Sequence, residues 1–109
     1  MKTYYYALAS KAFLIDEEPI EEVLKERVRY YQEQEKEIDF WLVQQPAFLE
    51  APELATVKEK CPQPAAAIIS TNQSFITWLK LRLEYVAVGE FQAPSESIPE
   101  PIASLAAVG

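Results

Sequence analysis

The sequence predicts a single α/β (α+β) domain: a sheet of about four strands, mixed or antiparallel, packed with two long helices and a short one. Two patterns support this prediction. Segments of strand length, in which side chains alternate between two faces, are separated by segments whose apolar residues recur every three to four positions. The length of 109 residues fits one domain, and a hydrophobic content of 50% is enough for an ordinary core.

The first strand is expected at residues 3–9 and the first long helix at about residues 19–36. The strand, TYYYALA, places tyrosines on both faces, which suits a sheet that is at least partly covered on both sides. Pro19 fits the first turn of a helix, and the acidic residues before it suit the positive end of the helix dipole. The buried stripe of this helix is expected to contain Ile20, Val23, Leu24, Val28 and Tyr31.

A second strand at residues 37–43 and a short helix at residues 52–60 are expected next. Alternation in the strand puts Ile38, Phe40 and Leu42 on one face and Asp39, Trp41 and Val43 on the other. Pro52 fits the first turn of the short helix. The single cysteine, Cys61, follows the helix; without a histidine or a second cysteine, it is interpreted as a small apolar filler rather than a nucleophile.

The third strand, at residues 65–70, and the long helix at residues 74–86 form the centre of the predicted fold. The strand AAAIIS is apolar almost throughout, which is typical of a central strand covered on both faces. Thr71 or Asn72 is expected to cap the helix, and Gly89 to end it or to mark the turn just past its end. The helix has two apolar stripes: Ile76, Leu79, Leu83 and Val86 with Phe75 at the edge, and Trp78, Leu81 and Tyr85.

This helix leaves two questions open. The second stripe is either covered by the chain itself or left for a partner. Arg82 projects from within the apolar arc, where a guanidinium group needs a carboxylate or carbonyl oxygens as partners. Asp39 is the most attractive candidate for that carboxylate, although a surface position near the start of its strand fits the sequence equally well.

The globular domain is expected to cover residues 1–93 and to end with a short strand at residues 90–93, anchored by Phe91. Residues 94–109 contain prolines at three positions and little that could pack. They are therefore predicted to form an extended or disordered C-terminal tail.

Composition narrows the class of function. The chain has no histidine and only two glycines, which excludes Ser-His-Asp and Cys-His catalysis and a phosphate-binding glycine-rich loop. No cofactor and no metal site are expected. The net charge of −7 disfavours nucleic acid and anionic membrane surfaces as partners, because both require clustered basic residues. The apolar runs are too short to span a bilayer, and one cysteine suits a reducing compartment.

Several long strings resemble one small family, in order from about residue 2 to about residue 102. They are TYYYALAS (3–10), EIDFWLV (37–43), PAFLEAPELA (46–55), AIIST (67–71), FITWLKLRLEYV (75–86) and GEF (89–91). The chain resembles the accessory subunit of the aerobic magnesium-protoporphyrin IX monomethyl ester oxidative cyclase of oxygenic phototrophs. This cyclase builds the fifth ring of protochlorophyllide in chlorophyll biosynthesis.

The resemblance implies a non-catalytic protein. The oxidation would belong to a separate di-iron catalytic subunit associated with membranes, and the family would support the accumulation, assembly or activity of that subunit. The implied partners are the di-iron subunit and, as further candidates, other chlorophyll-biosynthesis proteins. The implied location is the cytoplasm or the plastid stroma, with recruitment to the thylakoid membrane through partner proteins.

The candidate contact surface draws on the second strand and the long helix. Aromatic and arginine side chains are the ones best able to anchor a protein interface. The candidate residues are Asp39, Phe40, Trp41, Trp78, Arg82 and Tyr85; the alternative is that they only complete the core.

Two other classes of function are open, as is self-association. A tetrapyrrole carrier could bind a propionate group through Arg82, although the chain has no histidine to ligate the central magnesium. An enzyme in its own right has the least support, because acid/base and metal-binding groups are missing. A homodimer formed through the second stripe of the long helix would cover the same apolar surface.

Overall fold

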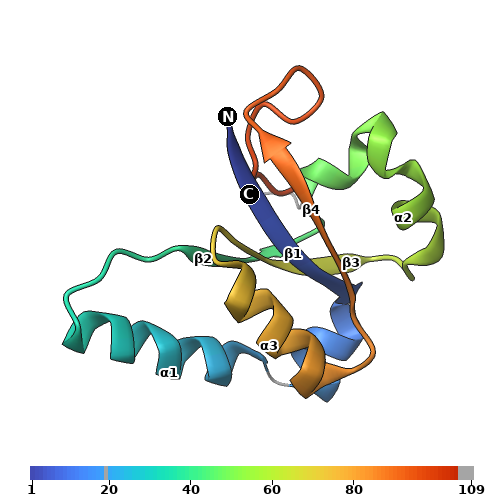
Figure 1. The fold of residues 1–109 in the computed structure, drawn as a ribbon. Coiled ribbons are helices and arrows are strands. Elements are labelled where there is room, and N and C mark those ends of the chain that lie inside the picture. Colours follow the sequence, from blue (N-terminus) through green and yellow to red (C-terminus); the bar gives the residue numbers. More distant parts are fainter. Residues whose placement is uncertain (19, 106–109) are drawn as a thin grey trace.

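A four-stranded antiparallel sheet forms the middle layer of the protein in the computed structural model, which describes residues 1–18 and 20–105 (Figure 1). Its strands are β1 (Lys2–Ser10), β2 (Phe40–Gln44), β3 (Ala65–Ser70) and β4 (Ala87–Ala93), in the order β2-β3-β1-β4. Each neighbouring pair is antiparallel. The predicted α+β fold is confirmed, and of the two strand arrangements left open by the sequence, the antiparallel one is correct.

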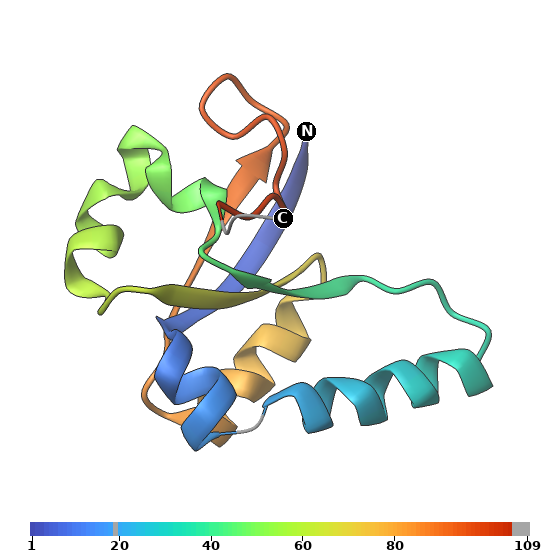
Figure 2. The same cartoon turned by 180° about the vertical axis from the view of Figure 1, so that it is seen from behind.

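Helices cover one face of the sheet, and short helical turns with the C-terminal segment cover the other (Figures 1 and 2). On the first face, α3 (Gln73–Leu83) packs on β1, β3 and β4, and α1 (Ile20–Glu33) lies beside it after the π-helical turn η1 (Ala12–Glu17). The second face is covered by η2 (Ala47–Glu50), η3 (Pro52–Leu54), α2 (Ala55–Lys60) and residues 94–105.

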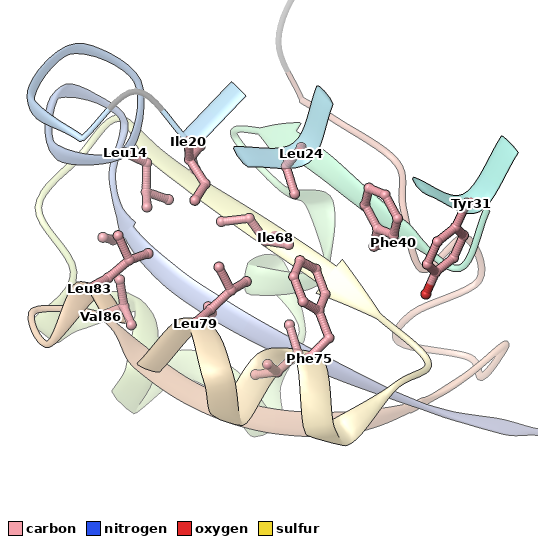
Figure 3. Packing of buried hydrophobic residues seen from close by; sticks show 14 residues of the cluster. Leu14, Ile20, Leu24, Tyr31, Phe40, Ile68, Phe75, Leu79, Leu83 and Val86 are labelled. Carbon is pink, nitrogen blue, oxygen red and sulfur yellow. The ribbon is translucent and has the colours of Figure 1, made fainter. Parts of the chain in front are cut away.

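Each face has its own hydrophobic core, because side chains alternate along the strands. Ile68 of β3 lies in the core on the helical face, where Leu24 of α1 and Leu79 of α3 point toward it (Figure 3). The next residue, Ile69, belongs to the opposite core, together with Phe48 of η2. All of β3 is buried, as the continuous apolar run predicted. The core on the helical face fixes the buried side of α3 to the sheet.

The long helix ends earlier than predicted. α3 stops at Leu83, and Glu84 follows with a φ of 61°. The ammonium group of Lys80 donates to the carbonyl oxygen of Glu84 at 2.9 Å and so satisfies one of the final carbonyl groups. Gly89 does not end the helix but lies inside β4, which begins at Ala87 rather than at residue 90. The sequence does not indicate this helix end, because the residue with positive φ is a glutamate and glycine is the usual residue at such a position.

Gly89 is needed because the ring of Tyr6 lies over it. The two residues are opposite each other on β4 and β1, and a Cβ atom at Gly89 would lie 2.7 Å from Cζ of Tyr6. Tyr6 is buried, and its ring contacts the rings of Phe48 and Phe91, so the ring cannot move aside cheaply. We expect Gly89→Ala to lower the free energy of unfolding by about 1–3 kcal/mol in urea denaturation. An equal loss in a Tyr6→Leu background, which lacks the ring, would contradict this explanation.

The C-terminal segment packs more closely than the sequence suggested. Ile98 is 2% exposed and belongs to the core on the second face. Ser104 forms an isolated bridge with Pro46, and its hydroxyl donates to the carbonyl oxygen of Gln44. The expectation that little in this segment packs is wrong for Ile98, because a single isoleucine among polar residues gives no periodic signal. The domain boundary at residue 93 stays a prediction, and residues 106–109 of the predicted tail lie outside the described residues.

Candidate partner-binding surface

α3 buries one of its two apolar stripes and exposes the other. Phe75, Ile76, Leu79 and Leu83 are buried. Trp78 and Leu81, here called the exposed α3 stripe, are 46% and 75% exposed; Tyr85 is 79% exposed but follows the end of the helix, where its ring centre lies 6.3 Å from that of Phe13. Large apolar side chains gathered on one exposed helix face are typical of a surface that binds another protein. Among the described residues, Leu81 is therefore left largely uncovered and Trp78 half-covered, while the end of the helix at Leu83 separates Tyr85 from this stripe.

Arg82 and Asp39 do not form the ion pair that the sequence suggested. Arg82 is exposed, and its Cζ atom lies 5.6 Å from the centre of the Trp78 ring. Asp39 lies at the opposite end of α3, where its carbonyl oxygen accepts a hydrogen bond from the backbone N–H of Thr71 at 3.1 Å. Thr71 lies just before α3, and at 1.5 Å per residue the first residue of the helix, Gln73, is about 14 Å from Arg82 along the helix axis. The pairing is wrong because periodicity gives the direction of a side chain around a helix, not which end of the helix a strand residue approaches.

Tyr31 of α1 is the partner of Asp39. The Tyr31 hydroxyl donates to Oδ1 of Asp39 at 2.8 Å and accepts from Nη2 of Arg27 at 2.9 Å. Burial, and then the hydrogen bond to Asp39, raise the pKa of Tyr31, so the hydroxyl remains protonated at neutral pH. The Ser70 hydroxyl donates to the carbonyl oxygen of Asp39 at 2.8 Å. Asp39 precedes β2, so strand alternation does not place its side chain; the Tyr31 hydroxyl of α1 holds the carboxylate, and Ser70 of β3 holds the backbone carbonyl.

Arg27 is the residue of this region that the sequence analysis missed. Its guanidinium carbon lies 3.8 Å from the centre of the Phe75 ring and 5.5 Å from that of Phe40. These cation–π contacts connect α1 with α3 and β2. Arg27 is three residues after Leu24 and four before Tyr31, both of which are buried. That spacing puts Arg27 on the buried side of α1 and could have identified it from the sequence.

The structure brings some of the six candidate residues together and separates others. Phe40 is 4% exposed, and its ring centre lies 5.4 Å from that of Phe75, which lies 6.1 Å from that of Trp78. Phe40 therefore supports the exposed α3 stripe from below. Trp41 points to the other face of the sheet, where its ring lies 6.4 Å from that of Tyr4. The six residues do not form one continuous surface, and the role of each in binding stays a prediction.

We expect Tyr31→Phe to lower the free energy of unfolding by about 1–3 kcal/mol, because one hydroxyl bridges a guanidinium group and a carboxylate. Tyr30→Phe is the matched control. Tyr30 is the neighbouring tyrosine of α1, it is 54% exposed, and its hydroxyl makes no side-chain hydrogen bond within the described chain. We expect the control to change stability by less than about 0.5 kcal/mol. Equal effects of the two substitutions in urea denaturation would show that the bridge contributes nothing to stability.

Three further features are the metal-binding potential of the chain, the length of its helices and the state of Cys61. In residues 1–18 and 20–105, no cluster of three or more His, Cys, Asp or Glu side chains could hold a metal ion. Over the same residues, no helix is long and apolar enough to cross a membrane. Cys61 is half-buried, and burial raises the pKa of its thiol, which favours the neutral form and agrees with the interpretation of Cys61 as an apolar filler.

Comparison with known proteins decides the family. Residues 2–93 match the family described as Ycf54 protein. The chain belongs to the Ycf54 family. It is 69% identical over 105 residues to the Ycf54-like protein of Synechocystis sp., a match that covers 96% of this chain and 79% of that protein. It is 40% identical over 102 residues to the chloroplastic YCF54 protein of Arabidopsis thaliana, a match that covers 93% of this chain and 46% of that protein.

Solved structures of similar proteins have the same fold. The All0216 protein from Nostoc sp. PCC 7120 is 79% identical, with a TM-score of 0.95 over 96% of this chain and 97% of that chain. The Ycf54 protein from Synechocystis sp. PCC6803 is 68% identical, with a TM-score of 0.94 over 96% of this chain and 98% of that chain. The Ycf54 family therefore includes proteins of cyanobacteria and chloroplasts, and this chain is a protein of the kind found in oxygenic phototrophs.

Proposed function

We propose that this chain is a non-catalytic accessory subunit of the magnesium-protoporphyrin IX monomethyl ester oxidative cyclase. It binds the di-iron catalytic subunit, assists its assembly and thereby supports the formation of protochlorophyllide in chlorophyll biosynthesis. The resemblance of its longest strings to that family supports the proposal. Membership of a family found in cyanobacteria and chloroplasts, where chlorophyll is made, is compatible with it.

The exposed α3 stripe is the observation on which this proposal depends. Trp78 and Leu81 form an apolar surface on α3, and Arg82 lies against Trp78 at its edge. Tryptophan, tyrosine and arginine are the residues most enriched at the energetic centres of protein interfaces. The stripe lies on a helix whose other side is fixed in the core, so little ordering entropy is lost when a partner binds.

We infer that recruitment to the thylakoid membrane occurs through partner proteins. The net charge of −7 disfavours direct attraction to anionic lipids.

Co-purification tests the proposed function. The chain would be tagged in its host, membranes would be solubilised in mild detergent, and the retained proteins identified by mass spectrometry. We expect the di-iron catalytic subunit of the cyclase to be retained. If no protein is retained while pigment absorbance follows the tagged chain, the accessory function is wrong and a tetrapyrrole carrier takes its place.

A further inference from the structure

A groove lies between α1 and α3, next to the exposed α3 stripe. Its volume is about 340 Å³. Its walls include Glu26, Arg27 and Tyr30 of α1, and Phe75, Trp78 and Arg82 of α3. Most of its surface is apolar, yet it contains two guanidinium groups. With two arginines and one glutamate, the groove has a net positive charge, opposite in sign to that of the chain as a whole, which has 17 acidic and 10 basic residues.

Neither arginine of the groove makes a direct ion pair among residues 1–18 and 20–105, although the Tyr31 hydroxyl links Arg27 to the carboxylate of Asp39. Arg27 donates through Nη2 to the Tyr31 hydroxyl, and its buried Nε has no acceptor. Arg82 contacts the Trp78 ring and makes no ion pair. The remaining arginine of the chain, Arg29, lies outside the groove and approaches Glu33 at 3.9 Å. Both guanidinium groups of the groove therefore have N–H groups that donate to no acceptor among the described residues.

A carboxylate is the chemical group that fits two such guanidinium groups. The planar fork of arginine matches the two oxygens of a carboxylate, and charge-assisted hydrogen bonds of this kind are short and strong. Phe75 and Trp78 form aromatic walls against which the apolar stem of a carboxylate side chain can pack. Phosphate-rich ligands are a poorer match, because the chain is strongly acidic and Arg27 and Arg82 are the only cationic groups among the described residues that line the groove.

We propose that this groove binds an aspartate or glutamate side chain of the protein partner, with an adjacent apolar residue covering Trp78. The inference depends on the proposed function, because it specifies the chemistry of the same partner. Arg82 contacts the carboxylate at the rim, and Arg27 attracts it from the α1 side. Glu26 lies on the α1 wall, is exposed and has no ion pair within the described residues. Its charge opposes the incoming acid and directs it toward α3.

A series of charge variants tests this proposal through the affinity for the purified catalytic subunit. Arg82→Met keeps an apolar stem of similar length and loses the charge, and we expect it to weaken binding about tenfold. We expect Arg82→Lys, which keeps the charge, to weaken binding less, and Glu26→Gln to strengthen it. Arg82 and Glu26 are both exposed, so circular dichroism should show an intact fold in each variant.

The outcomes separate the two proposals. If the wild-type protein binds and Arg82→Met binds equally well, the charge of Arg82 contributes nothing to binding. The inference is then wrong, while the accessory function stands. If the wild-type protein does not bind the catalytic subunit, the proposed function itself is wrong. Stronger binding by Glu26→Gln would support the acidic partner, and weaker binding would contradict it.

Zero-length cross-linking identifies the acid directly. In the Arg82→Lys variant, a carbodiimide activates a nearby carboxylate, the new amine displaces the resulting urea, and an amide bond joins the two proteins. We expect mass spectrometry to find position 82 joined to an aspartate or glutamate of the partner. The wild-type protein is the control, because Lys80 is nearby but donates to the carbonyl oxygens of Glu84 and Val86. Cross-links from position 82 only to Glu26 of the same chain would contradict the proposal.

Discussion

Leu79→Ala should lower the free energy of unfolding by about 2–5 kcal/mol, whereas Leu81→Ala should change it by less than about 0.5 kcal/mol. Leu79 is 0% exposed and lies in the core against the sheet, while Leu81 is 75% exposed. Both substitutions are leucine to alanine in the same helix, so intrinsic helix propensity contributes equally to the two results. Urea denaturation of the two variants measures the difference.

This pair of variants tests which stripe of α3 belongs to the core. A domain of this size has a total stability of about 5–15 kcal/mol, so losing Leu79 would be a large fraction of it. A similar loss for Leu81→Ala would mean that the exposed α3 stripe is covered within the protein. In that case the surface proposed for the partner would not be free.

Trp78→Ala should weaken binding of the catalytic subunit by about 2 kcal/mol, or about thirtyfold, with little loss of stability. Trp78 is 46% exposed, and its ring is bordered by Arg82 and supported from below by Phe75. Partner contact would bury the exposed part of this ring, and tryptophan is the residue that contributes most often to such hot spots. The affinity would be measured with purified proteins, and the stability of the variant by denaturation.

Leu105→Ala is the control for this experiment. Leu105 is 52% exposed, and its backbone N–H donates to the carbonyl oxygen of Gln45, away from α3. We expect its substitution to leave affinity unchanged. If Trp78→Ala binds like the wild-type protein and Leu105→Ala does not, the partner binds the C-terminal segment rather than α3.

The sequence predicted the elements of this fold well because most of them bury one face. β3 was recognisable from its continuous apolar run, and the buried side of α1 from the spacing of Ile20, Leu24 and Tyr31. Asn72 was one of two residues expected to cap α3, and its side chain accepts from the backbone N–H of Phe75 at 3.2 Å. These signals are local, so they can be read without knowing how the elements are arranged.

Features that depend on tertiary arrangement could not be predicted in the same way. The end of α3 was missed because Glu84 adopts a conformation usual for glycine. Burial of Ile98 depends on where the chain returns after β4, and no local pattern encodes that path. The antiparallel direction of the strands was also open, because a short sheet with helical connections allows both arrangements.

The candidate surface was predicted in part. The two stripes of α3 were visible from periodicity, but only the structure shows that Trp78 and Tyr85 are the exposed ones. The partner of Asp39 was predicted wrongly, because an arginine was sought on α3 while Tyr31 and Arg27 of α1 lie closer. A polar residue on the buried side of an amphipathic helix, such as Arg27, is a better indication of where a buried polar contact lies than a charge pair chosen from the sequence.

The central claim is that the catalytic subunit binds the exposed α3 stripe, and oxidative footprinting of the complex tests it most directly. Hydroxyl radicals would oxidise the free protein and the complex with the catalytic subunit, and mass spectrometry would measure the rate at each residue. We expect Trp78 and Leu81 to be protected in the complex, while Met1, which is 81% exposed and lies just before β1, reacts equally fast in both. Protection of Met1 with unchanged oxidation of Trp78 and Leu81 would show that the partner does not bind the exposed α3 stripe.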